Sequence, residues 1–585
     1  MDAAVKVITD AAAAHCFVST DRPSGFRKDN LSSSSTRLDL WFYGTVHAAQ
    51  GPASIYLHVA DPSFIEAPRV YLSERPHWLK GWHPHLAKLG PNMPEDLCYS
   101  DHEKYQLLPH NPAAAIARVL VDAADTLTRI AKPESAIEDS KREIAAWWGL
   151  DAHFGSAYID IEPTANVQTC FATVYKVGEK SHALLISENT QRLATRLGVI
   201  GKPGAVFSTV IYPQVPHPLY LTNAGTPSTE SEIQKWLKKI SSHAYEHWHN
   251  QLLKQETYRK EIGLHLFRTQ GQVIGYLMHE SARRAMRRVR SRRQMGDFFH
   301  DHIYGGRQPI LRISAMRFDE EYLVRRNLRA GSKDFRGVNI LLIGCGAIGG
   351  YLAQSLVQLG AGIPLNLTRG SLTLCDRETF QNSNIGRHIL GFRYLGLTKA
   401  SALKAHLAEF RPSAEIKAEP HPFHELESRL DEFDVIVDAG GYESLSRHLS
   451  KLTRQSSWFR RGRALLSVWI EGQGGVTRCL LQDNAHAACY DCMWNYNSTT
   501  APSQRHKAYT DPRWTEMRGD GYATMTPYAV SAPQTAAALA IDALLDWRAE
   551  SPSPRFRSRS AEGSGITASF AKDLERGKAC PGCST

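Results

Sequence analysis

The sequence predicts an α/β fold for residues 331–585, an α+β domain for residues 1–135 and a connecting domain of mixed structure for residues 136–330. Three observations lead to this division. The chain has 585 residues, which is more than one hydrophobic core usually supports. A buried strand that leads into a glycine-rich turn opens the last part, and strands and helices then alternate.

The composition is that of an ordinary globular protein, with 42% hydrophobic and 22% charged residues. No apolar run reaches the length of a membrane-spanning helix, and the N-terminus lacks the basic start and long apolar core of a secretion signal. We therefore expect a cytoplasmic protein without a membrane partner. The formal charge of +10 would permit nucleic-acid binding, and residues 283–293 form the densest basic run. Because no nucleic-acid motif accompanies this run, a solvated helix face or a surface for an acidic partner protein is favoured.

Strands followed by a helix are expected in the N-terminal domain. Residues 36–46 and 54–59 have the composition of strands. After a loop rich in proline and glycine, Asn111 and Pro112 are typical of a helix start, as its cap and its first-turn proline. An apolar stripe at helical spacing follows, formed by Ile116, Leu120, Ala123, Leu127 and Ile130.

The connecting domain shows no pattern that indicates chemistry. Residues 132–135 contain a proline and mark its expected start, and strand-like residues 170–175 precede charged helical stretches near residues 230–300. The default expectation is a domain that connects its neighbours or docks a partner.

The last part of the chain shows the alternation of a parallel sheet covered by helices. Its strand-like runs are buried in character and lie far enough apart for a helix between them. They comprise residues 338–343, 371–376, 435–438 and 465–469.

A glycine-rich turn follows the first of these strands. Gly344, Gly346 and Gly349 match the pattern G-x-G-x-x-G between a strand and a helix. Glycines there let the backbone approach phosphates, while the helix N-terminus offers unpaired amides. Taken alone, the motif also fits dehydrogenases and methyltransferases. Asp376 ends the second strand, where a carboxylate can hold ribose hydroxyls.

Polar residues downstream of the ribose acid separate these interpretations. Asn384, Arg387 and Lys399 follow Asp376 in this order. An arginine and a lysine can neutralise triphosphate charge and stabilise the charge that develops at an attacked α-phosphate, whereas a hydride-transfer site has no need of them. The pair therefore favours ATP chemistry.

Residues 339–399 resemble the adenylating domain of ThiF-type and ubiquitin-activating enzymes. In that family the glycine loop, the ribose aspartate, an N-x-x-R element and a G-x-x-K-A element recur in this order, and Arg325, Arg326 and Asn327 are similar to its R-N element. The resemblance implies a Rossmann-like fold that binds ATP and activates the C-terminus of a ubiquitin-like or other small protein. It also implies a homodimer, in which Arg326 reaches the ATP of a partner subunit.

The magnesium ligand departs from the family pattern. The family usually carries an aspartate–asparagine pair after the strand that ends here in Asp438, and the acid of that pair helps to hold Mg²⁺. A glycine stands at the apparent position of the acid. Asp438 or Glu443 is the expected substitute.

Two C-x-x-C pairs lie in the same terminal region, Cys489 with Cys492 and Cys580 with Cys583. Each pair can offer two thiolates, and four thiolates close a tetrahedral structural zinc site. In a reducing compartment, zinc is favoured over redox or free thiols. ThiF-type enzymes resemble this arrangement.

Cys98 is a candidate nucleophile in the N-terminal domain. Strands, a His83-Pro84-His85 loop, a Leu-Cys pair and a helix follow in the order found in ubiquitin-conjugating enzymes, which about 100 residues of the chain resemble. The chain departs from the eukaryotic pattern because His85 stands where asparagine is usual, and Asn92 is one candidate for the missing amide. An exposed thiol at this place can accept an acyl group.

The combination of the three parts resembles bacterial fusion enzymes of antiphage operons, including the cyclic-oligonucleotide (CBASS) type. The resemblance implies that ATP adenylates the C-terminus of a small protein, that a thiol of the activating domain captures it, that Cys98 accepts it, and that a target amine receives it.

For the second of these steps, the capture by a thiol of the activating domain, the sequence offers no cysteine at the expected place. No cysteine lies between Cys492 and Cys580, where the family's acceptor falls, and Ala523 occupies the expected position. Three explanations remain. Ala523 replaces a cysteine, as an engineered change that traps a complex would; Thr524 or a neighbouring hydroxyl forms an oxyester; or Cys98 attacks the adenylate directly. The first is favoured, because a small residue stands at the place.

Three other functions are compatible with parts of the sequence. A sulfur-carrier adenylyltransferase of cofactor synthesis shares the nucleotide and zinc sites, but leaves Cys98 and 330 N-terminal residues without a role. A dehydrogenase gives no reason for Arg387, Lys399 and the cysteine pairs. A non-catalytic scaffold with a degraded site is the third.

Overall fold

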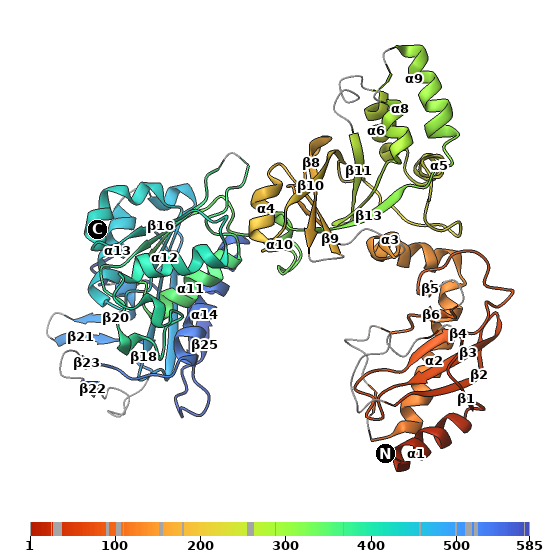
Figure 1. Ribbon diagram of the computed structural model, residues 1–585. Coiled ribbons are helices and arrows are strands. Elements are labelled where there is room, and N and C mark those ends of the chain that lie inside the picture. Colours follow the sequence, from red (N-terminus) through yellow and green to blue (C-terminus); the bar gives the residue numbers. More distant parts are fainter. Residues whose placement is uncertain are drawn as a thin grey trace. The chain divides into compact units, whose positions relative to one another are not determined.

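The structure is a computed structural model in which the chain forms two compact units, Met1–Asp319 and Glu320–Thr585 (Figure 1). It describes all of the chain except residues 1, 25, 27–37, 89–92, 101–106, 109, 151–155, 178–180, 254–261, 287, 290, 367, 456–457, 498–499, 509–517, 520–523, 578 and 584–585. Among the helices of the described residues, none combines the length and the apolar character needed to cross a membrane.

An antiparallel sheet with the order β1-β2-β3-β4-β6-β5 begins the first unit. Its core is closed by helix α2, whose apolar stripe from Ile116 to Ile130 is buried. The side chain of Asn111 caps α2 by accepting the amide hydrogen of Ala114 at 3.1 Å, which confirms the predicted helix start. The elements are α1 (Asp2–Ala13), β1 (Val18–Thr20), β2 (Leu40–Ala48), β3 (Gly51–Val59), β4 (Arg69–Leu72), β5 (Leu86–Lys88), β6 (Glu95–Leu97) and α2 (Pro112–Ile130).

Helix α3 (Pro133–Gly149) follows and passes through residues 135 and 136, where the sequence predicted a domain boundary. A closed barrel with the order β10-β11-β12-β13-β7-β9-β8 comes next. Its strands are β7 (Ala157–Asp160), β8 (Gln168–Val177), β9 (Ser181–Ser187), β10 (Pro203–Tyr212), β11 (Ile262–Thr269), β12 (Gln272–Leu277) and β13 (Leu311–Arg317). Its helices are α4 (Thr190–Arg196), α5 (Glu230–Ile240), α6 (Ser242–Leu253), α8 (Glu280–Met286), α9 (Arg292–Phe298) and the π-helix η2 (Phe299–Tyr304).

The described part of the basic run of residues 283–293 includes the end of α8 and the start of α9. Arg284 is exposed and pairs with Glu280 one turn earlier, whereas the guanidinium of Arg283 lies 5.2 Å from the centre of the Phe207 ring. These described arginines thus contact their own fold, as a helix face of a folded domain does.

The second unit is built on a sheet with the order β16-β15-β14-β17-β18-β19-β24-β25. The first five strands are parallel and the last three antiparallel, which confirms the predicted, mostly parallel sheet. Its elements include α10 (Glu320–Arg325), β14 (Asn339–Ile343), α11 (Ala347–Gln358), β15 (Ser371–Cys375), α12 (Lys399–Phe410), β16 (Ile416–Glu419), β17 (Val435–Asp438), α13 (Glu443–Gln455), β18 (Ala464–Glu471), β19 (Val476–Gln482), α14 (Ser531–Arg548), β24 (Phe556–Ser560) and β25 (Phe570–Lys572).

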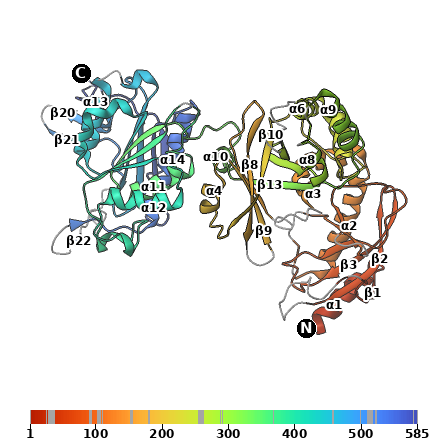
Figure 2. The same cartoon turned by 45° about the horizontal axis from the view of Figure 1, so that its top comes forward.

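Helices cover both faces of this sheet (Figures 1 and 2). Ile340 and Leu342 of β14 pack with residues of α11, α12 and α14, whereas Leu341 and Ile343 pack with residues of α13 and of the short 3-10 helices on the other face. This alternation along one strand is why a run of four apolar residues, 340–343, is needed at the centre of a sheet that is covered on both faces.

Candidate active site

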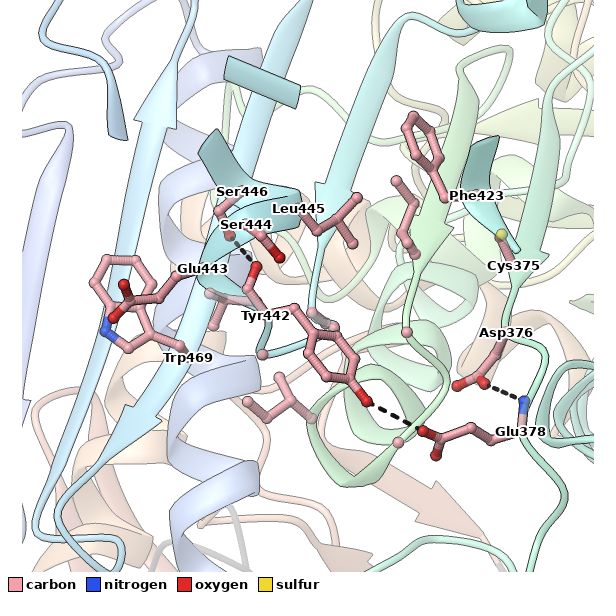
Figure 3. A pocket seen from close by; sticks show the side chains of 18 of the residues that line it. Cys375, Asp376, Glu378, Phe423, Tyr442, Glu443, Ser444, Leu445, Ser446 and Trp469 are labelled. Atoms are coloured by element: carbon pink, nitrogen blue, oxygen red, sulfur yellow. Dashed lines mark hydrogen bonds between the residues drawn. The ribbon is translucent and has the colours of Figure 1, made fainter. Parts of the chain in front are cut away.

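A cavity of about 1030 Å³ opens at the carboxyl ends of β14, β15, β17 and β18. β14 is hydrogen-bonded to β15 on one side and to β17 on the other, so the chain order reverses at this point. Ligands of open α/β sheets bind in the crevice at such a switch point. Figure 3 shows residues from the ends of β15 and β18 and from the start of α13 around the cavity.

The glycine-rich turn lies at this point of the sheet. Gly344 has a φ of +89°, and a Cβ on it would lie 2.7 Å from backbone atoms of Ala439 and Gly440, so a side chain is excluded. Gly346 is the N-cap of α11, and the space where its Cβ would stand is open. Both residues line the cavity. Gly349 is not among the described residues that line the cavity. A Cβ on Gly349 would lie 1.9 Å from the carbonyl oxygen of Gly344.

Asp376 fixes the glycine turn from the end of β15. One carboxylate oxygen accepts the amide hydrogen of Cys345 at 2.7 Å, and the other accepts that of Glu378 at 2.8 Å. Burial raises the pKa of Asp376, although both amides act in the opposite direction. The carboxylate therefore lines the cavity in a fixed orientation and keeps lone pairs for further donors such as hydroxyls.

Lys399 begins helix α12 and is 8% exposed. Its Nζ lies 2.5 Å from one carboxylate oxygen of Glu378, and the hydroxyl of Tyr442 donates to the other at 3.3 Å (Figure 3). The bond from Lys399 lowers the pKa of Glu378. The sequence pointed to Lys399 but not to its partner Glu378 or to Tyr442, which holds the other oxygen of Glu378. The place of Glu378 two residues after the ribose acid was the available signal for it.

Asn384 and Arg387 come to the same cavity from the turn after β15. The Asn384 side chain accepts the amide hydrogen of Gln381 at 2.9 Å, which fixes its turn. The guanidinium of Arg387 lies 5.4 Å from the centre of the Tyr528 ring. The structure thus brings Asp376, Asn384, Arg387 and Lys399 together around one space, with two cations among them.

His388 supports the glycine turn from beneath. Its Nδ1 accepts the amide hydrogen of Leu390 at 3.1 Å, so Nε2 carries the hydrogen and donates to the carbonyl of Cys345 at 2.8 Å. The imidazole is buried, and burial lowers its pKa to about 4 from the ordinary 6.5.

This shift predicts a dependence of stability on pH. As the pH falls from about 6.5 to about 4, the unfolded chain binds a proton on residue 388 before the folded chain does, so folding stability falls. The expected contribution is about 3 kcal/mol. We expect the difference in unfolding free energy between the unaltered chain and His388→Gln, measured by urea denaturation, to shrink by this amount over that range. Parallel pH curves for the two chains would contradict the assignment.

Asp438 stands at the end of β17 but is fully buried and is not among the described residues that line the cavity. Its carboxylate accepts the hydroxyl of Ser446 and, at 3.1 Å, the amide of Gly440. Burial raises its pKa to about 6. Of the two expected magnesium ligands, Glu443 is the one that lines the cavity. Arg326 is exposed, donates to the Tyr322 hydroxyl at 3.0 Å and is likewise outside the described lining of its own chain.

The four cysteines of the two C-x-x-C pairs come together in the second unit. The sulfurs of Cys489, Cys492, Cys580 and Cys583 lie within 4.8 Å of one another, and four of the sulfur pairs are 3.4 to 3.7 Å apart. A tetrahedron with Zn–S bonds of about 2.3 Å has edges of about 3.8 Å, so the cluster fits zinc. A Cβ on Gly582 would lie 3.0 Å from the sulfur of Cys489, which explains the glycine between the last two ligands.

Cys98 follows β6 in the first unit and is exposed. Its thiol contacts the carbonyl oxygen of Ser100 at 3.7 Å, and its amide donates to the carbonyl of His85 at 2.9 Å. Ala523 and Asn92 lie outside the described residues.

The comparisons with known proteins cover both units. A model described as the ThiF family matches residues 319–579. The ATP-dependent ubiquitin transferase-like protein Cap2 of Pseudomonas aeruginosa is 30% identical over 537 residues, which cover 90% of this chain and 91% of that protein. Cap2 of Vibrio cholerae is 28% identical and covers 55% of each chain. Escherichia coli MccB with ATP aligns over 51% of this chain and 83% of its own, at 13% identity and a TM-score of 0.33. This chain belongs to the Cap2 family of ATP-dependent ubiquitin transferase-like proteins, with a ThiF domain in its C-terminal unit.

Proposed function

We propose that the C-terminal unit uses ATP to adenylate the C-terminal carboxylate of a ubiquitin-like or other small protein. The observation that carries the proposal is the convergence of a glycine turn, a ribose-type acid and two cations on one cavity at the switch point. The relatives' name, ATP-dependent ubiquitin transferase-like protein, supports the same chemistry.

The residues of the cavity suggest a role for each. The open N-terminus of α11 receives phosphate, and Asp376 holds ribose hydroxyls. The carboxylate oxygen of the small protein attacks the α-phosphorus, a P–O bond forms and pyrophosphate leaves. Arg387 and Lys399 stabilise the charge that develops in this step. Glu443 is the carboxylate best placed to hold Mg²⁺, which would screen the triphosphate.

The acyl group then passes to Cys98 as a thioester, and from Cys98 to a target amine; AMP leaves when the first thiol attacks the acyl adenylate. The exposure of Cys98 and its place after a sheet and before α2 support a conjugating-enzyme-like role for residues 1–135. Between these steps we favour capture by a thiol at position 523, where Ala523 replaces a cysteine, over an oxyester on Thr524 or a neighbouring hydroxyl and over direct attack by Cys98 on the adenylate. Antiphage defence in the cytoplasm is the proposed setting, because the order of the three parts resembles bacterial fusion enzymes of antiphage operons and the Cap2 relatives are bacterial.

Two structural roles complete the proposal. Zinc bound by Cys489, Cys492, Cys580 and Cys583 fastens the end of the chain to the adenylating domain. A homodimer formed through this domain brings Arg326 of one subunit to the ATP of its partner. Residues 136–330 connect the two catalytic parts.

The test is intact-mass spectrometry of the chain with ATP, Mg²⁺ and candidate small proteins encoded beside it. We expect an acyl adduct that requires ATP and is absent from Cys98→Ala, with Cys16→Ser, another exposed cysteine of the same unit, as the matched control. Adenylate without any adduct on Cys98 would limit the function to activation. Absence of ATP–pyrophosphate exchange with every partner would instead favour a non-catalytic scaffold.

A further inference from the structure

A histidine lies opposite Cys98 in the sheet of the first unit and has no role in the scheme above. The carbonyl of His85 accepts the amide hydrogen of Cys98 at 2.9 Å. This bond continues the β5–β6 ladder, in which Leu86 is opposite Leu97. Leu86 and Leu97 are both buried in the core, and neighbouring residues of a strand point to the other face. His85 and Cys98 therefore end the two strands side by side, where Cys98 is exposed.

Helix α3 holds the imidazole of His85 in place. Its Nε2 lies 3.3 Å from a carboxylate oxygen of Asp139, and the Trp147 ring packs against it edge-on with centres 6.1 Å apart. The side chain is only 12% exposed. The backbone of His85 is left-handed, with a φ of +64°, a conformation that costs energy in a residue other than glycine. Such strain persists where the surroundings fix it and is common at functional sites.

The two ring nitrogens have different surroundings. Nε2 lies 3.3 Å from a carboxylate oxygen of Asp139, and because a carboxylate accepts hydrogens but donates none, this neighbour favours the tautomer with the hydrogen on Nε2. Both ring nitrogens are shielded from solvent, and neither has a hydrogen-bond partner among the residues that the structure describes. In this tautomer Nδ1 is unprotonated, on a residue whose backbone carbonyl accepts the amide hydrogen of Cys98.

We propose that His85 is the general base of the last transfer and that Asp139 is its positioning residue. The inference rests on the proposed function, since it needs an acyl group on Cys98. The amine nitrogen attacks the thioester carbonyl carbon and forms a C–N bond. The tetrahedral intermediate then breaks its C–S bond and releases the Cys98 thiolate. Nδ1 takes the proton that the amine nitrogen must lose and passes it to the thiolate or to water.

The experiment compares two nucleophiles on the acylated full chain. The adduct on Cys98 is isolated, and its discharge to free lysine and to hydroxylamine is followed by mass spectrometry. Lysine amines need a proton acceptor, whereas hydroxylamine is unprotonated and strongly nucleophilic at neutral pH and depends less on a base. We expect His85→Ala to slow discharge to lysine by about 100-fold or more and discharge to hydroxylamine far less, so that the adduct accumulates.

Matched variants separate this role from a structural one. Asp139→Ala is expected to slow lysine discharge in the same selective way, but less, and His47→Ala, an exposed histidine of β2, is expected to change neither rate. His85→Asn keeps a polar side chain but no base and is expected to stay slow. Recovery with asparagine, equal slowing with both nucleophiles, or no slowing would overturn the inference. Failure to form any adduct in the unaltered chain would be recognised earlier and would remove the proposed transfer to Cys98, on which this inference rests.

Discussion

Replacement of Lys399 by alanine is expected to lower ATP–pyrophosphate exchange by about 10²- to 10³-fold. Lys399 is nearly buried at the start of α12 and pairs with Glu378 inside the cavity. Without the lysine, the bound triphosphate lacks one neutralising cation and lies beside the unpaired carboxylate of Glu378 in the same cavity. Both the binding of ATP and the stabilisation of the charge at the α-phosphate should suffer.

Two further variants make this prediction specific. Lys404→Ala removes an exposed lysine from the same helix and should leave exchange unchanged. Lys399→Ala combined with Glu378→Ala removes the repulsive carboxylate, so ATP binding should recover in part while the maximal rate stays low. A loss smaller than about tenfold on changing Lys399 would place the reacting phosphates elsewhere.

The same ion pair shows how the nucleotide must enter. The carboxylate of Glu378 binds the ammonium group of Lys399, which a phosphate group of the nucleotide needs. The hydroxyl of Tyr442 donates to the other oxygen of the same carboxylate. Binding of ATP therefore requires Glu378 to turn away or to share Lys399. Since Glu378 is about half exposed, this rearrangement costs little compared with moving a buried group.

Most residues that meet at the proposed nucleotide site could be expected from the sequence to lie together, because they follow strands of a parallel sheet or lie in one connection between two strands. Gly344 comes after β14 and Asp376 after β15, and parallel strands bring their carboxyl ends to one edge. Asn384, Arg387 and Lys399 keep a fixed order within one connection, so a local motif was enough to find them.

The features that were missed depend on contacts between distant segments. Tyr442 meets Glu378 only because β17 pairs with β14. The burial of Asp438 likewise depends on Ser446, which α13 brings back over the strand end. In the connecting region, β10 pairs with β11 across about 50 residues that contain two helices, a pairing that no local pattern reveals. The barrel was therefore not predicted.

The cluster of four cysteines, which we propose binds zinc, is the second place where a large effect is expected. Cys489→Ser should remove one Zn²⁺ per chain, measured by elemental analysis, and should destabilise the end of the C-terminal unit. Structural zinc in small peptides contributes about 10–16 kcal/mol, which equals or exceeds the stability of a typical domain. Hydrogen exchange should therefore rise strongly around residues 489–497 and 573–583, with Cys16→Ser as an exposed control.

The loss of zinc should also affect the proposed active site, because the segment around the first two cysteines and the cavity share residues. Asp491, between the first two ligands, accepts a hydrogen bond from Arg447 of α13 at 2.7 Å. The same guanidinium lies 4.5 Å from the centre of the Trp494 ring, and Trp494 lines the cavity together with Glu443 at the start of α13. Removal of zinc releases Asp491 and so loosens both α13 and the cavity wall. We therefore expect Cys489→Ser to reduce ATP–pyrophosphate exchange as well as stability. A chain purified without zinc that exchanges at the full rate would show that the four thiols hold this region together without a metal.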